Sequence, residues 1–231
     1  YVDPQSYKNL SMYDYSLLKG MKEHKIIYCC NKQYDGPSLE NVEFHPIFSY
    51  RQDMNPLVKI ISYLCSLLKL VAILKSVRPD VLHIQWWKQW NLDYFFLSIY
   101  MRYAKQIVFT AHNLVPHNSG DSMKTKCMKY YYKVDKIIVH DHNSKRELIK
   151  GFQVKEDKIA VIAHGILDFS VNEAEVKSII DEVTAKYSLK NKLVFATMGG
   201  QSPYKGTDLI CDAFLSSEVL KNNDDVFLII A

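Results

Sequence analysis

Short apolar runs rich in β-branched residues alternate with longer stretches of helical period along this sequence. Val81–Gln85, Ile107–Ala111 and Lys136–Val139 are such runs, and Leu92–Ala104 and Met123–Tyr132 are the helical stretches between them. Strands that alternate with helices form parallel sheets whose faces the helices cover. The sequence therefore predicts an α/β fold with doubly wound, Rossmann-like parallel sheets.

The same alternation predicts elements on both sides of this stretch. We expect further helices over Met12–His24, Pro56–Val77, Ser144–Phe152 and Thr207–Phe214. We expect further strands at Ile26–Cys30, Phe44–Phe48, Ile159–Ile162, Leu193–Met198 and Val226–Ile230. Ser144 with Glu147 three residues later has the pattern of a capping box, which places a helix start at Ser144.

The alternation is interrupted once, by the charged helical stretch Asn172–Tyr187. We therefore expect a first domain over 1–165, a connection over 166–190, and the beginning of a second α/β domain over 191–231. The chain opens on Tyr1 and stops inside the apolar run Val226–Ala231. We expect it to be a piece of a longer protein whose first strand precedes Tyr1.

Composition restricts the partners. The 29 Lys and Arg against 25 Asp and Glu leave a net charge of +4, too little for a dedicated nucleic-acid binder. The five cysteines have neither metal-finger nor Cys-x-x-Cys spacing, which indicates reduced thiols, a cytoplasmic location and no metal.

The longest apolar run, Ile60–Leu74, has 15 residues and contains Lys69, so it is too short and too charged to span a bilayer. A core helix is the favoured interpretation. The alternative is a peripheral membrane contact, in which Lys59, Lys69, Lys75 and Arg78 flank a helix that rests on anionic lipid.

A strand that ends at Met198 leads into a glycine-rich loop and then a helix. Gly199 and Gly200 let the backbone approach an anion, Ser202 and Lys205 add polar and charged groups, and the helix start offers free N–H groups. The loop fits neither a Walker motif nor the dinucleotide-binding glycine pattern. It predicts a phosphate-binding cradle, with an ordinary strand-to-helix turn as the alternative.

Histidines stand at the carboxyl ends of several predicted strands, where ligands bind in doubly wound sheets. For His83, His140 and His142 a structural hydrogen bond is the favoured interpretation. His112 is better placed to face a sugar, because Asn113 and His117 follow it in a polar loop. His140 and His142 lack a third ligand, so we predict no metal site.

Four segments in order resemble the group 1 (family four) retaining glycosyltransferases, which have the two-domain GT-B fold. These segments are Asp80–His83, Thr110–Asn113 with Pro116 and His117, Asp135–Val139 with Lys158–Gly165, and Gly199–Gly206 with Asp208–Phe214. The resemblance covers roughly residues 80–231, and residues 1–79 share only the α/β rhythm.

The resemblance implies transfer of a sugar from a nucleotide-diphosphate sugar to a glycan or lipid-linked acceptor, with retention of configuration and with neither cofactor nor metal. It implies polysaccharide or cell-envelope biosynthesis in the cytoplasm, with peripheral contact at the inner face of the membrane as a further option. Lys205 would neutralise the donor diphosphate, helped by Gly199, Gly200 and Ser202, and His112 would stabilise the reacting sugar. His83, Asn113 and His117 would lie on the acceptor side.

Two departures keep other functions open. Gly200 stands where many members of the family have an arginine, and the family's acidic segment that holds the donor would lie beyond Ala231. We therefore expect this chain alone to bind the donor weakly and to catalyse little transfer. A non-catalytic scaffold or nucleotide-sugar-binding subunit is one alternative. An epimerase or phosphorylase-like enzyme with the same architecture is another. Trp86 and Trp87 are the better candidates for stacking on a sugar, although core packing is the favoured interpretation of the aromatic clusters.

Overall fold

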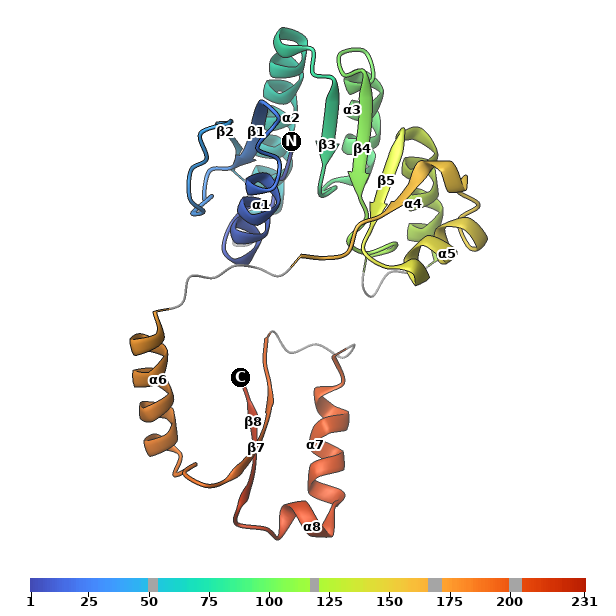
Figure 1. Cartoon of the computed structure of the whole chain (residues 1–231). Helices are drawn as coiled ribbons and strands as arrows, with labels where there is room; N and C mark the ends of the chain where they lie inside the picture. The colour runs from blue at the N-terminus through green and yellow to red at the C-terminus, as the bar shows by residue number, and fades with distance from the viewer. Residues whose placement is uncertain (50–53, 117–120, 166–171, 200–204) are drawn as a thin grey trace. The chain divides into compact units, whose positions relative to one another are not determined.

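The computed structural model describes residues 1–49, 54–116, 121–165, 172–199 and 205–231. The chain divides into two compact units, Tyr1–Asp168 and Phe169–Ala231 (Figure 1). The boundary falls inside the expected connection 166–190, and the helix of that stretch is counted with the second unit. The assignment of residues 166–190 as a separate connection stays a prediction.

The first unit is built on parallel strands, as the alternation predicts. Four of them form one sheet, in the order β3 (Val81–Ile84), β4 (Gln106–Thr110), β5 (Lys136–Val139) and β6 (Ile159–Val161). β1 (Ile26–Asn31) pairs in parallel with β2 (Val42–Phe48). In the larger sheet Leu82 lies opposite Ile107 and Ile137 opposite Ile159, so buried apolar residues face each other across the ladder.

Residues 1–3 join these two groups of strands. Val2 forms parallel bridges to Cys29 of β1 and to Ile84 of β3. Its N–H donates to His83 O at 2.8 Å, and its carbonyl accepts from the Gln85 N–H at 3.0 Å. The start of the chain therefore lies within the sheet, between β1 and β3.

Within the described part of the first unit, five α-helices accompany the strands. They are α1 (Asn9–Lys19), α2 (Pro56–Val77), α3 (Trp90–Tyr100), α4 (Asp121–Lys133) and α5 (His142–Lys150), and a 3₁₀ turn covers Glu156–Lys158. α2 has the bounds that the sequence predicts. Asn55 caps its start by accepting the Leu57 N–H at 3.0 Å, Pro56 occupies the first turn, and Arg78 ends it in a left-handed conformation.

The predicted start of α5 at Ser144 is wrong. The N-cap is Asp141, whose Oδ1 accepts the Ser144 N–H at 2.8 Å and whose Oδ2 accepts the Ser144 hydroxyl at 2.6 Å. A carboxylate satisfies two donors of the first turn at once and adds a negative charge at the positive end of the helix. The stronger cap therefore begins the helix at His142.

Trp87, Trp90 and Tyr130 pack in the core of the first unit, as the favoured interpretation of the aromatic clusters expects. Trp87 stacks on Phe109 with centroids 5.0 Å apart, and Tyr130 contacts both Trp87 and Trp90. Trp86 is different, because it stacks on a histidine at the edge of the sheet. Among the tryptophans, Trp86 thus remains the candidate for a site residue.

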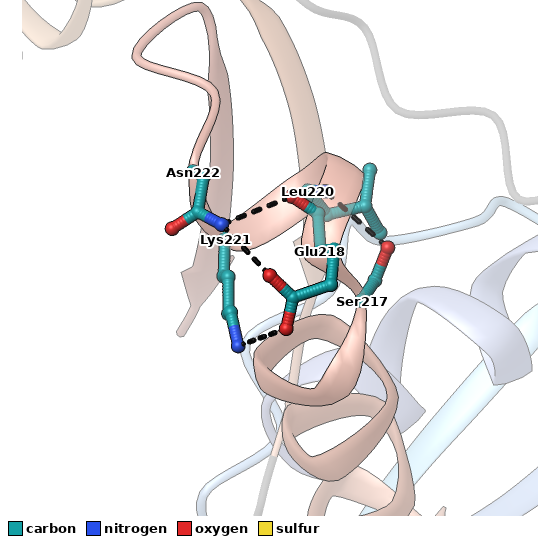
Figure 2. Close-up of polar contacts among 5 residues, drawn as sticks. All are labelled: Ser217, Glu218, Leu220, Lys221 and Asn222. Atoms are coloured by element: carbon teal, nitrogen blue, oxygen red, sulfur yellow. Dashed lines mark hydrogen bonds and ion pairs between the residues drawn. The ribbon is translucent and has the colours of Figure 1, made fainter.

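The second unit consists of α6 (Glu173–Lys186), β7 (Leu193–Thr197), α7 (Thr207–Ser216), α8 (Glu218–Lys221) and β8 (Val226–Ile230). β7 and β8 pair in parallel along their whole length. The single-turn α8 has no counterpart in the sequence prediction. Figure 2 shows its local polar contacts, in which the Leu220 N–H donates to Ser217 Oγ at 3.3 Å and Lys221 Nζ pairs with Glu218 Oε1 at 2.6 Å.

Candidate functional site

Three histidine rings form a row at the carboxyl edge of the four-stranded sheet. His112, His140 and His164 follow β4, β5 and β6 in turn. The ring centroids of His112 and His140 are 5.0 Å apart, and those of His140 and His164 are 5.1 Å apart. Because carboxyl ends of adjacent parallel strands lie at one edge, the strand order produces this row directly.

His112 is held from three sides. Its Nε2 lies 2.7 Å from Oε1 of Gln85, and the Trp86 indole stacks on it nearly parallel, at 4.4 Å and 8°. The Tyr13 ring meets it edge-on at 5.2 Å and also lies 5.0 Å from the His164 ring. The imidazole is therefore fixed by Tyr13 of α1 and by Gln85 and Trp86 of the segment after β3.

Gln85 is itself held by a polar chain. Gln85 is fully buried, and its Nε2 lies 3.1 Å from His83 Nε2. His83 Nε2 in turn lies 2.7 Å from Thr110 Oγ1. His83 thus supports Gln85 in this structure, and its expected place on the acceptor side stays a prediction. Alternate residues of a strand point to the same face, which brings 83 and 85 together.

Burial keeps the imidazoles of His112 and His83 neutral. Burial lowers the pKa of His112 to about 3, with further contributions from His140 and His164. Burial also lowers the pKa of His83 to about 3, followed by the nearby amino terminus and His112. A neutral imidazole offers one donor and one acceptor nitrogen, which suits hydrogen bonds to sugar hydroxyls.

Hydrogen-bond accounting couples His112 to His140. His140 Nδ1 lies 3.0 Å from the Ile162 carbonyl, which can only accept, so this nitrogen carries a hydrogen. His140 Nε2 lies 3.2 Å from His112 Nδ1. One hydrogen fits between these two nitrogens, and the orientation of the Gln85 amide decides which ring donates it.

A buried carboxyl pair, which sequence reasoning missed, lies near the start of the chain. Asp14 accepts hydrogen bonds from the hydroxyls of Tyr1 and Tyr28. Burial raises the pKa of Asp14 to about 6, and burial together with Asp14 raises that of Asp3 well above its usual range. The pair of carboxyl groups therefore favours holding a proton. Asp3 and Asp14 belong to no recognisable sequence motif, so the sequence alone did not indicate them.

Among the residues that the structure describes, no three His, Cys, Asp or Glu side chains are arranged to hold a metal ion. None of the three histidines of the row lines the cavity of about 680 Å³ in the first unit. Its lining includes Ile27, Leu74, Val81 and Leu82, near the amino ends of the strands, and also His83. The cavity is thus distinct from the histidine row and reaches only the residue that supports Gln85.

In the second unit the structure brings Lys205 to Gly199. A Cβ placed on Gly199, which has φ +100°, would lie 2.8 Å from Lys205 Nζ, so the absence of a side chain leaves room for the ammonium group. The backbone N–H of Gly199 has a partner within the second unit. That N–H donates to Ala231 O at 2.9 Å, because it continues the β7–β8 ladder.

The remaining expected site residues are Asn113, Gly200, Ser202 and His117. Asn113 is described and exposed. Gly200, Ser202 and His117 lie outside the described residues. Sequence reasoning missed Gln85 and Tyr13: Gln85 carried a signal, two residues beyond His83 at a strand end, whereas Tyr13 is about a hundred residues from His112 and carried none.

Comparison with known proteins places this arrangement in context. The family model described as Glycosyltransferase Family 4 matches residues 16–167. No curated protein sequence matches the chain significantly.

Solved structures share the fold at low identity. The Anabaena protein HepE, crystallised with UDP and glucose, has a TM-score of 0.63 and 14% identity over 99% of this chain and 59% of its own. A glycosyltransferase from Rickettsia africae has a TM-score of 0.52 and 16% identity over 96% and 63%. UDP-GlcNAc 2-epimerase from Neisseria meningitidis, bound to UDP-GlcNAc, has a TM-score of 0.52 and 11% identity over 96% and 69%. The chain thus spans about three fifths of the length of HepE.

Proposed function

The chain belongs to Glycosyltransferase Family 4, and from this premise we propose that it serves transfer of a sugar from a nucleotide-diphosphate sugar to a glycan or lipid-linked acceptor, with retention of configuration. Its fold is α/β with parallel sheets, of the GT-B type. The solved relative HepE is known with UDP and with UDP-glucose, which supports a nucleotide sugar as donor here. We assign the reaction to polysaccharide or cell-envelope biosynthesis in the cytoplasm, with peripheral contact at the membrane.

The observation that carries the proposal is His112, a neutral imidazole fixed at the carboxyl edge of the sheet by Gln85 and Trp86. Both of its nitrogens already have partners, at 2.7 Å to Gln85 and 3.2 Å to His140. We propose that a sugar hydroxyl replaces the longer of these two bonds. Gln85 would then keep the ring oriented while Nδ1 binds the sugar, and a pre-oriented donor or acceptor costs little reorganisation in the transition state.

We further propose that Lys205 binds the donor diphosphate. Its ammonium group lies over Gly199, where the loop precedes α7. A cation at this place compensates the negative charge that accumulates on the leaving nucleoside diphosphate as the glycosidic bond breaks. Gly199 contributes the space that it leaves for Lys205.

Thermal shift with a panel of UDP- and GDP-sugars tests this proposal. We expect a nucleotide sugar to raise the melting temperature of the wild type and of Lys190→Ala, a control at another exposed lysine. Lys205→Ala should lose this response. If no nucleotide sugar stabilises the wild type, the non-catalytic scaffold becomes the better interpretation.

The role of His112 needs a separate measurement. In the complete protein, His112→Ala should lower the transfer rate by about a hundredfold or more, as loss of a preorganised polar contact in a transition state does, and should leave the affinity for the nucleoside diphosphate nearly unchanged. Gln85→Ala should lower the rate less, because it acts through the orientation of His112. An unchanged rate in His112→Ala would contradict the assignment.

A further inference from the structure

Helix α2 carries two different apolar faces. The face with Tyr63, Leu67, Leu70 and Leu74 has spacings of four, three and four residues and is buried in the core. A second set has the same spacings and faces solvent: Leu57, Ile61, Leu64 and Leu68 are 71%, 61%, 36% and 55% exposed. Large aliphatic side chains so exposed along one helix face mark an interaction surface.

The charges around this face have one sign. Residues 54–79 contain no Asp or Glu, and Lys69, Lys75 and Arg78 gather on the carboxyl-terminal half of the helix and directly after it. The neighbouring helix α3 adds Phe95, which is 63% exposed, while its single carboxylate, Asp93, is buried and bonded to Tyr63 of α2. The surface therefore combines exposed apolar side chains with cationic ones: the half-buried Lys59 lies in the amino-terminal half of the helix, and Lys69, Lys75 and Arg78 lie toward its carboxyl end.

The expectation that this segment is too short and too charged to span a bilayer needs correction, because the helix extends beyond the run Ile60–Leu74: α2 has 22 residues and a mean hydropathy of 2.1 over its best window, enough to span by length and composition alone. Its buried face nevertheless packs against the strands and α3, so the helix cannot leave the first unit without exposing that core. An amphipathic helix of this kind lies along a bilayer, with its apolar side chains among the acyl chains and its lysines at the headgroups.

We propose that the exposed face of α2 binds the surface of an anionic lipid bilayer and so holds the first unit on the membrane. Two copies packed through this face would bury cationic side chains such as Lys69 and Lys75 with no carboxylate on either helix to compensate them, whereas anionic headgroups complement them. This membrane contact rests on the peripheral location given in the proposed function. Vesicle binding is measured without any sugar nucleotide, so a failure of membrane binding can be told apart from a failure of sugar transfer.

Vesicle sedimentation tests the proposal. The 231-residue chain should sediment with vesicles that contain phosphatidylglycerol and bind vesicles of pure phosphatidylcholine at least tenfold more weakly. Binding should decrease as the salt concentration rises, because salt screens the lysine–headgroup attraction. Failure to sediment with either vesicle would overturn the proposal.

Matched variants locate the contact. Ile61→Ser with Leu68→Ser removes apolar side chains, and Lys69→Glu with Lys75→Glu reverses charge; each pair should weaken binding about tenfold or more. Leu215→Ser on α7 and Lys150→Glu on α5 change comparably exposed residues elsewhere and should bind like the wild type. Equal losses in the controls would contradict a specific role for α2.

Cys65 provides a structural readout that does not depend on the variants. It is exposed on α2, three of the other cysteines are buried, and Cys211→Ser removes the remaining partly exposed thiol. An environment-sensitive dye on Cys65 should shift to shorter wavelength with anionic vesicles. A dye that does not shift with anionic vesicles would overturn the proposal. The same holds if the chain binds no vesicles but forms a dimer in solution that Ile61→Ser with Leu68→Ser abolishes, because the face would then bind a second copy.

Discussion

Nδ1 of His112 lies 3.2 Å from Nε2 of His140, and the two rings stand at the ends of adjacent parallel strands. Only one hydrogen fits between these nitrogens, so the protonation of either ring constrains the other. The relationship makes the candidate site a connected unit from Gln85 to the Ile162 carbonyl. A ligand that binds His112 therefore exchanges an existing hydrogen bond for a new one.

The first prediction concerns pH. The pKa of His112 lies at about 3 in the folded protein against an ordinary value of 6.5, so between these values the folded state binds fewer protons than the unfolded chain. The stabilisation due to neutral His112 is complete above pH 6.5 and is lost as the pH falls toward 3. Urea unfolding should show the stability difference between wild type and His112→Gln shrinking by about 2 kcal/mol between roughly pH 7 and 5.

This difference isolates His112. Burial raises the pKa values of Asp14 and Asp93 to about 6, which gives the opposite slope, but both carboxyls are present in both proteins and cancel. The carbon chemical shifts of the His112 ring provide a direct check and should stay those of a neutral imidazole near pH 5. A ring that titrates near pH 6.5 would contradict the burial argument.

The second prediction concerns Asp93, which joins α2 to the segment after β3. Its Oδ1 accepts the Tyr63 hydroxyl at 2.6 Å, and its Oδ2 accepts the N–H groups of Lys88 at 2.8 Å and Gln89 at 2.7 Å. Asp93→Ala leaves these donors buried without an acceptor and should lower the free energy of unfolding by about 3 kcal/mol. Tyr63→Phe removes one donor and should cost about 1 kcal/mol. The prediction is wrong if denaturant unfolding shows Tyr63→Phe to be more destabilising than Asp93→Ala.

Much of the fold could be predicted because its signals are local. Pro56 and Asn55 define the start of α2, and an apolar run defines β5, whose bounds match the prediction. The start of α5 could not be placed, because both Asp141 and Ser144 are good caps and only their mutual hydrogen bonds decide between them. The capping-box pattern alone does not show which of the two residues caps the helix.

The candidate site was predictable only in part, for a reason of distance along the chain. Strand-end positions indicate His112 and His140, since parallel strands share an edge. The contact of Tyr13 with His112 depends on how α1 packs, and no local pattern encodes it. The use of the Gly199 N–H by Ala231 depends likewise on β8, which follows it by some thirty residues.

The third prediction separates two glycines of the second unit. A Cβ on Gly199 would lie 2.8 Å from the flexible end of Lys205, whereas a Cβ on Gly206 would meet Leu209 at an ordinary 3.6 Å. Both have positive φ, of +100° and +66°, so Gly199→Ala and Gly206→Ala should each cost about 1 kcal/mol of stability.

Ligand binding should distinguish the two variants. Only Gly199→Ala displaces the ammonium group of Lys205, so only this variant should lower the affinity for a nucleotide sugar, by about tenfold. Calorimetric titration of both variants with the nucleotide sugar that stabilises the wild type measures the effect. Equal losses would show that the conformation of the loop, rather than the position of Lys205, governs binding.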